Sequence, residues 1–240
     1  MDSEQKDVAN LYAVGAERGV NWRRKYWDWE EKNIELSKHE DFDYYFNNWG
    51  FRSINEEDYT LTDENDIWCF GCSFTAGVGV PITKGWPSII QKETNKKVKN
   101  FGVGGAGPKT MLRIMSSWYK AVNNKPKQIF VLGAFEGRDE LWDEDGNCFL
   151  LQNNRVTHNL PYNPIKIDAE YTEIYEKIEA FPTTVRLDPA IMLADALKLG
   201  VNDRGRDNSR NLIEQHNHYG HPGVLFQKYV ATRFLELIKT

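Results

Sequence analysis

One serine, Ser73, stands where a strand is expected to end, in surroundings that suit a nucleophile. It follows the apolar run 67–70 and lies within Gly71-Cys72-Ser73-Phe74-Thr75. An apolar run of strand length that passes into glycine and small residues indicates a buried strand entering a tight turn. Open α/β sheets place their ligand crevice at the carboxyl ends of the strands. A serine there can attack a carbonyl if a base and oxyanion donors lie beside it.

A glycine-rich loop is the first candidate for those donors. The run Gly102-Val103-Gly104-Gly105-Ala106-Gly107 follows the second expected strand and precedes a helical pattern. A loop in this position can present backbone N–H groups to an anion. A dinucleotide fingerprint fits poorly, because the loop follows the second strand and no acidic residue for a ribose lies at the usual distance. The loop is better interpreted as an oxyanion donor; the alternative is that its glycines only permit close helix–strand packing.

Three histidines precede the last expected helix: His216, His218 and His221. Imidazoles are common zinc ligands, which makes a metal site one interpretation. However, no cysteine lies near them in the sequence, and their spacing is not a standard ligand pattern. A single histidine that reaches Ser73 as general base is favoured.

Two cysteines form a Cys-x-x-Cys pattern, Cys69 and Cys72. Such a pair can be redox-active when it opens a helix after a strand. Here Cys69 lies inside the apolar run itself, so it is better interpreted as a small core residue.

The elements expected to position these groups alternate between strands and helices. Short apolar runs predict strands at 67–70 and 128–133, and a further strand is expected at 98–101. Between them, Trp86 begins a helical spacing that ends near Asn95, and a second helix ends at the break 123–126. One face of that second helix carries Met111, Met115, Trp118 and Val122. This β-α-β-α-β order with short connections predicts a parallel sheet covered by helices.

The second half of the chain gives weaker signals. Residues 148–152 predict a short strand or hairpin, and residues 153–167 and 201–219 predict loops. Three helices are expected, at 169–180, 189–199 and 223–238. In the middle one, Asp188 would cap the amino end, Pro189 suits the first helical position and Gly200 can cap the carboxyl end. In the last one, Phe226, Val230 and Phe234 recur at spacing four.

Composition limits the class of protein. The chain has 240 residues, 40% of them apolar, which is enough for one α/β domain. Its net charge of −5 gives no basic field for nucleic acid. No apolar run approaches the roughly 20 residues that span a bilayer, and the polar first ten residues do not favour a secretory signal. Three cysteines do not suggest a disulfide framework. A cytoplasmic location is expected, with association with a virion as a second option.

The first 65 residues form a polar extension with several aromatic residues. Trp22, Tyr26, Trp27 and Trp29 lie among charged residues. We expect this extension to pack its aromatic side chains on the main domain, residues 66–240; the alternative is a platform for a sugar or a protein partner. The run 47–53 has the composition of an ordered turn leading into the core.

These motifs together resemble the SGNH (GDSL-type) hydrolase superfamily, over residues 67–138 and 203–238. Gly71-Cys72-Ser73-Phe74-Thr75 is similar to the first block of that family, with Cys72 at the position of the usual aspartate. The resemblance makes Ser73 the nucleophile, Gly105 an oxyanion donor and His221 the base. The overall pattern, including Asn48-Trp49-Gly50-Phe51-Arg52, is similar to SGNH-like proteins of phage and environmental origin.

The triad acid departs from the family pattern. The family places aspartate three residues before the histidine, and here that residue is His218. Asp207 is the candidate acid if an insertion separates it from His221, and Asp203 is the second choice. His218 could instead be the base, but Gln215 lies three residues before it. A serine–histidine dyad is a further alternative, and Asp207 could also be an ordinary loop or cap carboxylate.

The third block departs as well. It normally supplies an asparagine to the oxyanion hole, and the matching position here is Phe135, which donates no hydrogen bond. Arg138 or a backbone N–H is the candidate substitute. Loss of one such donor costs on the order of a hundredfold in rate.

The resemblance implies a three-layer α/β/α sandwich with a parallel, flavodoxin-like sheet and an amino-terminal extension. It implies an esterase or deacetylase that cleaves an O-acyl ester, on a small molecule or a carbohydrate, through an acyl-enzyme. The alternative is a weakly active or inactive SGNH-like protein that binds a glycan or a partner. No cofactor, metal, nucleic acid or membrane is expected to take part, and the oligomeric state is left open.

Overall fold

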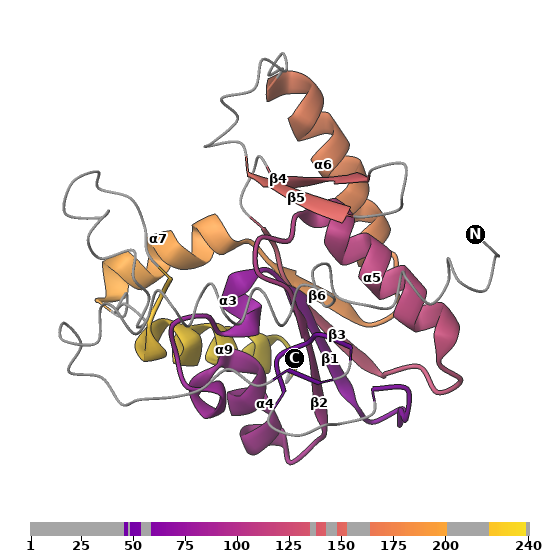
Figure 1. Ribbon diagram of the computed structural model, residues 1–240. Helices are drawn as coiled ribbons and strands as arrows, with labels where there is room; N and C mark the ends of the chain where they lie inside the picture. The colour runs from indigo at the N-terminus through magenta and orange to yellow at the C-terminus, as the bar shows by residue number, and fades with distance from the viewer. Residues whose placement is uncertain are drawn as a thin grey trace, which may run out of the picture.

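Four parallel strands form the central sheet, in the order β2-β1-β3-β6 (Figure 1). The computed structural model describes residues 46–47, 49–53, 59–134, 138–142, 148–152, 164–200 and 221–238. The strands are β1 (Ile67–Gly71), β2 (Val98–Gly102), β3 (Gln128–Leu132) and β6 (Thr184–Leu187). The order reverses between β1 and β3, as in flavodoxin-like sheets, which place ligands at that point. The predicted strands are confirmed, and β6 is an addition to them.

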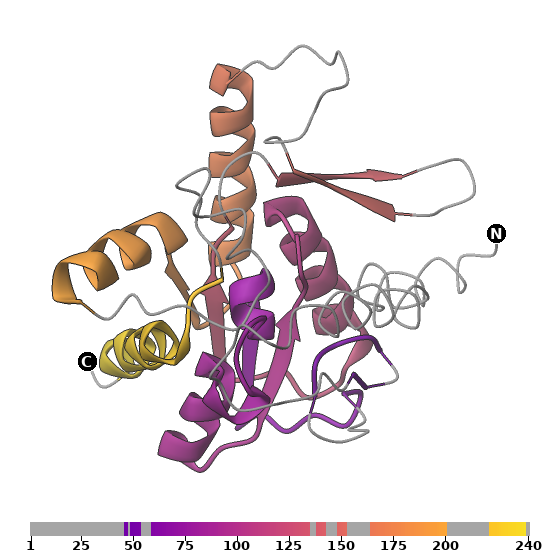
Figure 2. The ribbon, with the colours of Figure 1, turned by 60° about the vertical axis from the view of Figure 1, so that its left-hand side comes forward.

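Helices cover both faces of the sheet, which confirms the predicted three-layer α/β/α arrangement (Figure 2). On one face α4 packs against α9, and α9 packs against α7; on the other, α5 packs against α6. The bounds are α4 (Trp86–Thr94), α5 (Pro108–Ala121), α6 (Pro164–Glu179), α7 (Pro189–Leu199) and α9 (Val224–Leu237). The described residues also form four short elements: α3 (Ser73–Ala76), η2 (Ile82–Lys84) and the antiparallel strands β4 (Arg138–Trp142) and β5 (Cys148–Gln152).

Two predictions about the second half need correction. Helix α6 begins at Pro164, so the last part of the predicted loop 153–167 is helical; proline is well tolerated in the first turn of a helix, where its missing N–H costs nothing. Strand β6 was not predicted. It has four half-buried residues, one of them Arg186, and so lacks the continuous apolar run that marks β1 and β3.

The caps predicted for α7 are confirmed. The Asp188 carboxylate accepts hydrogen bonds from the backbone N–H groups of Ala190 and Ile191, at 2.8 and 3.1 Å. Gly200 ends the helix with a φ of +69°, in the left-handed region that favours glycine. None of the described helices is long and apolar enough to cross a membrane.

The segment around residues 46–53 is part of the core. Asn47 accepts hydrogen bonds through its side chain from the N–H groups of Trp49 and Phe51, which makes the predicted ordered turn. Phe51 is fully buried and packs edge-on against Phe101 of β2, with ring centroids 5.0 Å apart. Arg52, one residue on, is also buried.

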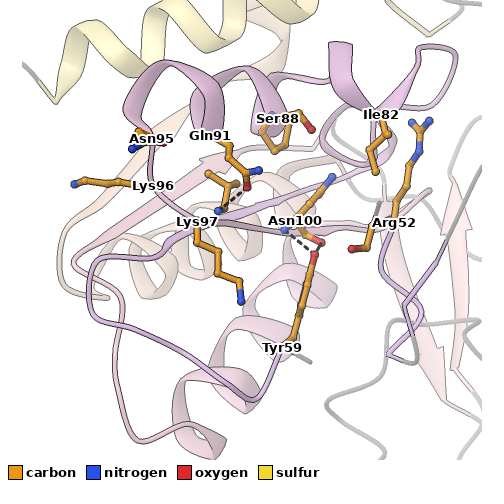
Figure 3. Close-up of a pocket in the computed structure, with 12 residues that line it drawn as sticks. Arg52, Tyr59, Ile82, Ser88, Gln91, Asn95, Lys96, Lys97 and Asn100 are labelled. Atoms are coloured by element: carbon orange, nitrogen blue, oxygen red, sulfur yellow. Dashed lines mark hydrogen bonds between the residues drawn. The ribbon is translucent and has the colours of Figure 1, made fainter. Parts of the chain in front are cut away.

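Side chains close the outer edge of β2. Every second backbone N–H of this strand faces away from β1 and meets a side-chain acceptor. Val98 N–H donates to Gln91 Oε1 at 3.0 Å and Asn100 N–H to the Tyr59 hydroxyl at 3.1 Å (Figure 3). Gly102 N–H donates to Asn100 Oδ1 at 2.9 Å. An edge whose donors are occupied does not template pairing with another strand.

Candidate functional site

The carboxyl ends of the four parallel strands bring the candidate residues to one edge of the sheet. Ser73 begins α3, directly after β1 and the extended residue Cys72. Gly105 lies in the loop after β2, with a φ of +82° that glycine adopts readily. Ala134 follows β3 closely, and Asp188 follows β6. This edge is the place where open α/β sheets bind ligands.

Two glycines allow α3 to pack directly on the strand ends. A Cβ on Gly71 would lie 2.0 Å from Thr75 Oγ1, and a Cβ on Gly102 would lie 2.3 Å from the backbone nitrogen of Ala76. Both distances are far below a possible contact, so neither position tolerates a side chain without a backbone shift. At Gly102, the first residue of the glycine-rich loop, the structure thus shows the close packing that was the alternative interpretation of that loop; its role as an oxyanion donor stays a prediction. The result is a sharp turn that leaves Ser73 with only 5% of its surface exposed.

Side chains from distant parts of the chain bind the carbonyl groups of α3. Asn100 of β2 donates from Nδ2 to the Thr75 carbonyl at 3.0 Å. Gln227 of α9 donates from Nε2 to the Phe74 carbonyl at 3.1 Å, although the two residues are 153 positions apart. Arg52 donates to the carbonyl of Ala76 at 3.1 Å. A one-turn helix cannot satisfy these carbonyls itself, so the three side chains supply the missing donors.

The segment that carries His221 packs against the residue next to Ser73. The ring centroids of Phe74 and His221 are 6.0 Å apart, edge to face, and Phe74 also contacts Phe226 at 5.8 Å. His221 is half-buried and lies two residues before Gly223, the amino-terminal cap of α9. The structure therefore brings His221 into the immediate neighbourhood of α3.

Gln227 holds α9 against α3, the short helix that Ser73 begins. It is fully buried, and its Oε1 accepts a hydrogen bond from the backbone N–H of Trp86 at 2.9 Å while its Nε2 binds Phe74. Trp86 is the first residue of α4, so its N–H has no partner inside that helix. One amide thus ties α3, α4 and α9 together. Sequence reasoning missed Gln227; a glutamine on the otherwise apolar face of the predicted last helix was the available signal.

A tyrosine holds the backbone after β3. The Tyr175 hydroxyl accepts a hydrogen bond from Ala134 N–H at 2.8 Å and donates to the Ala134 carbonyl at 3.3 Å. Burial raises the pKa of Tyr175 to about 12, so the phenol stays protonated at physiological pH. Arg186 lies over its ring, 4.3 Å from the centroid. The sequence predicted a helix over residues 169–180 but did not indicate that Tyr175 reaches this strand end.

Arg138 begins β4, and its backbone packs against the glycine-rich loop. A Cβ on Gly107 would lie 2.4 Å from the Arg138 carbonyl oxygen, and that oxygen accepts a hydrogen bond from the Tyr171 hydroxyl at 2.5 Å. The side chain's role as an oxyanion donor stays a prediction.

Several candidate residues lie outside the described part of the chain. These are Phe135, Asp203, Asp207, His216 and His218. The choice of triad acid, the second choice of base and the histidine metal site therefore stay predictions from the sequence. Among the residues that the structure describes, no group of three or more histidine, cysteine, aspartate or glutamate side chains could hold a metal ion.

The two cysteines of the Cys-x-x-Cys pattern are free thiols and are both fully buried. Burial raises the pKa of Cys69 well above the usual value of a thiol. A protonated thiol without solvent access is a poor nucleophile, which supports the interpretation of Cys69 as a core residue.

A cavity of about 340 Å³ lies beside the outer edge of β2, away from Ser73 (Figure 3). Its lining includes Tyr59, Gln91 and Asn100, whose polar atoms bind the β2 backbone as described above. Because these groups already have partners within the protein, the cavity is a weaker candidate site than the strand-end edge.

No family model matches the sequence, and no curated protein matches it. Solved structures do resemble it. A member of the lipolytic G-D-S-L family from Veillonella parvula is 16% identical, with 72% of this chain and 98% of that chain covered and a TM-score of 0.43. A putative lipolytic G-D-S-L protein from Desulfitobacterium hafniense is 14% identical, covering 70% and 98%, with a TM-score of 0.40.

An acetyl xylan esterase from the rumen bacterium Butyrivibrio proteoclasticus is 12% identical, covering 75% of this chain, with a TM-score of 0.39. This chain spans 64% of that esterase, less than two thirds of its length. The structures similar to this chain thus include SGNH-type lipolytic proteins and carbohydrate esterases. At such low identity the likeness transfers no activity and no residue role.

Proposed function

We propose that the protein is a serine hydrolase of the SGNH type that cleaves an O-acyl ester. The observation that supports this most directly is the contact between Phe74 and His221, with ring centroids 6.0 Å apart. Phe74 follows Ser73 in the chain, so the segment that carries His221 packs beside the turn that carries Ser73, at the carboxyl edge of the sheet. Neighbouring hydroxyl and imidazole groups are what nucleophilic catalysis by serine requires.

In the proposed mechanism Ser73 Oγ attacks the ester carbonyl while His221 takes its proton. The backbone N–H groups of Ser73 and Gly105 stabilise the oxyanion of the tetrahedral intermediate. The alcohol leaves with the proton from His221, and an acyl-enzyme remains. Water, deprotonated by His221, then attacks the acyl carbon and releases the acid and Ser73. Asp207 is proposed to orient the imidazole. The proposed substrate is an O-acyl or O-acetyl group on a small molecule or carbohydrate.

Labelling with a fluorophosphonate probe tests the nucleophile. The native protein should react at Ser73, and Ser73→Ala should abolish both labelling and hydrolysis of p-nitrophenyl acetate, with a loss of about 10³-fold or more. Ser88 on α4 is a matched control, because it lines the cavity at the β2 edge rather than the strand-end site. Ser88→Ala should label normally. A native protein that does not label would instead favour the inactive glycan- or partner-binding alternative.

Histidine variants test the base. His221→Asn should slow labelling by about a hundredfold or more, since general-base assistance is worth roughly 10²–10⁴-fold. His218→Asn should label at the native rate. The reverse result would transfer the base to His218.

Asparagine variants test the acid in the same way. Asp207→Asn should slow hydrolysis far more than Asp203→Asn, because an amide cannot stabilise the imidazolium that forms during attack. Equal, near-native rates in both variants would indicate a serine–histidine dyad.

A further inference from the structure

We infer that Arg52, from the segment before the predicted hydrolase domain, is a positioning residue for Ser73. The inference rests on the proposed function for its catalytic consequence, and on the described contacts for its structural part. Arg52 is 1% exposed and lies more than twenty positions before the turn that it contacts. The segment around Arg52, which precedes the predicted domain 66–240, therefore contributes to the candidate site.

The guanidinium group of Arg52 binds three backbone carbonyls that follow Ser73 in the chain. Nη1 donates to the Ala76 carbonyl at 3.1 Å and to the Gly77 carbonyl, and Nη2 donates to the Val80 carbonyl at 2.8 Å. These carbonyls lie at the carboxyl end of α3 and in the turn that follows it, where carbonyl oxygens carry partial negative charge. A buried cation at this end both satisfies and neutralises them.

The turn is shaped to receive this side chain. Gly77 has a φ of +72°, and a Cβ on it would lie 3.0 Å from Arg52 Nη1. Gly77 N–H and Val78 N–H both donate to the Ser73 carbonyl, so Gly77 contacts both Arg52 and the backbone of Ser73. The chain of contacts thus runs from Arg52 through the turn at 77–80 to Ser73.

Lysine cannot replace the fork of a guanidinium group. An ammonium is a point donor on a flexible stem, and it cannot reach three separated carbonyls in fixed directions. Arg52→Lys keeps the charge and removes this geometry. It is therefore a test of positioning rather than of charge.

The cavity beside β2 offers a chemical rescue. Arg52 is one of its lining residues and runs beside Ile82 at one end of it (Figure 3). An Arg52→Ala variant would enlarge this space, and free guanidinium ion could enter and bind the vacated carbonyls. Ammonium or sodium at equal concentration could not reproduce the planar fork.

The experiment measures fluorophosphonate labelling of Ser73 together with hydrogen exchange. Labelling in Arg52→Lys and Arg52→Ala should slow by about tenfold to a hundredfold, the cost of misplacing a reacting group by about an ångström. Millimolar guanidinium should restore Arg52→Ala several-fold, and sodium or ammonium chloride should not. Exchange should rise in the peptide that contains residues 73–80 and stay native in α5. Arg113→Lys is the matched control, because Arg113 on α5 pairs with Glu140 instead.

Each result decides the inference. Native labelling and native exchange in Arg52→Lys would overturn it. Uniformly raised exchange in every peptide, without rescue by guanidinium, would also overturn it, because Arg52 would then serve general stability alone. If the native protein does not label at all, the proposed function fails. Local exchange around residues 73–80 would still decide whether Arg52 holds the turn.

Discussion

The turn around α3 and the Lys109 ion pairs at the outer corner of α5, β4 and α6 differ in how far their polar groups are buried. At α3, buried amide and guanidinium groups from three distant segments bind backbone carbonyls. At the corner, the half-exposed Lys109 pairs with Asp139 at 3.2 Å and Glu170 at 2.6 Å. Unpaired buried groups are costly, whereas exposed ion pairs contribute little. The contacts around α3 are therefore the ones whose loss should lower the free energy of unfolding most.

The largest effect is expected from Gly102→Ala. The new Cβ would lie 2.3 Å from the backbone nitrogen of Ala76, so either β2 or α3 must move. We expect a loss of at least about 3 kcal/mol in the free energy of unfolding, at the upper end of overpacking effects. Urea denaturation would measure it. Gly85→Ala is the control, because its nearest neighbour would be the Ile82 carbonyl at an acceptable 3.4 Å. Equal losses in both variants would contradict the close packing of α3 on β2.

The next effect is expected from Gln227→Leu, which strands the Trp86 N–H and the Phe74 carbonyl without partners. Each unsatisfied buried group costs about 1–3 kcal/mol, so a loss of about 2–4 kcal/mol is expected. Fluorophosphonate labelling should slow as well, because α9 begins three residues after His221 and a shift of α9 would move His221. A labelling rate that stays native despite the lost stability would separate Gln227 from the positioning of the site.

Gln227→Glu sharpens the same test through its pH dependence. The carboxylate can accept from Trp86 N–H but cannot donate to the Phe74 carbonyl, whereas the protonated carboxyl can do both. Burial favours the protonated form, so its folded-state pKa should lie above the unfolded value of about 4.3. The variant should therefore be most stable at acid pH and lose stability as the pH rises. A stability difference from the native protein that does not change with pH would contradict this.

Gln227 also shows where sequence reasoning ends. Periodicity predicted the last helix and its apolar face, because Phe226, Val230 and Phe234 are four residues apart. All three side chains are fully buried in the structure. Sequence reasoning also predicted β1 and β3 from their apolar runs, and β2 although Lys99 and Asn100 interrupt its apolar residues. It could not pair Gln227 with Phe74, because that contact joins residues 153 positions apart and depends on how the helices pack.

The same limit explains the gaps in the candidate site. Ser73, Gly105 and His221 could be chosen because motifs mark them, but Arg52 and Tyr175 act on backbone groups and leave no local pattern. Strand β6 was missed because its four residues are only half-buried.

A smaller effect is expected from Tyr175→Phe, which removes the hydroxyl bound to Ala134. The loss at neutral pH should be about 1–2 kcal/mol, because one buried N–H remains without a partner. Burial raises the pKa of Tyr175 to about 12 from 10.0. The folded protein therefore holds this proton more tightly than the unfolded chain, and the contribution is complete below pH 10 and falls as the pH rises toward 12. Denaturation at pH 7, 10 and 11 should show the difference between native and variant shrinking; a constant difference would contradict it.

The smallest effect is expected from Lys109→Met at the outer corner. Burial lowers the pKa of Lys109, but its hydrogen bonds and charge interactions with Glu170 and Asp139 outweigh this and leave the pKa raised. A raised pKa means that the ion pairs contribute below pH 10.5 and are lost as the pH rises above it. Because Lys109 is about one third exposed, the loss should be under about 1 kcal/mol and should shrink in 1 M salt. Ser73 labelling should not change. A larger, salt-independent loss would mean that the corner is held as the α3 turn is, by desolvated contacts.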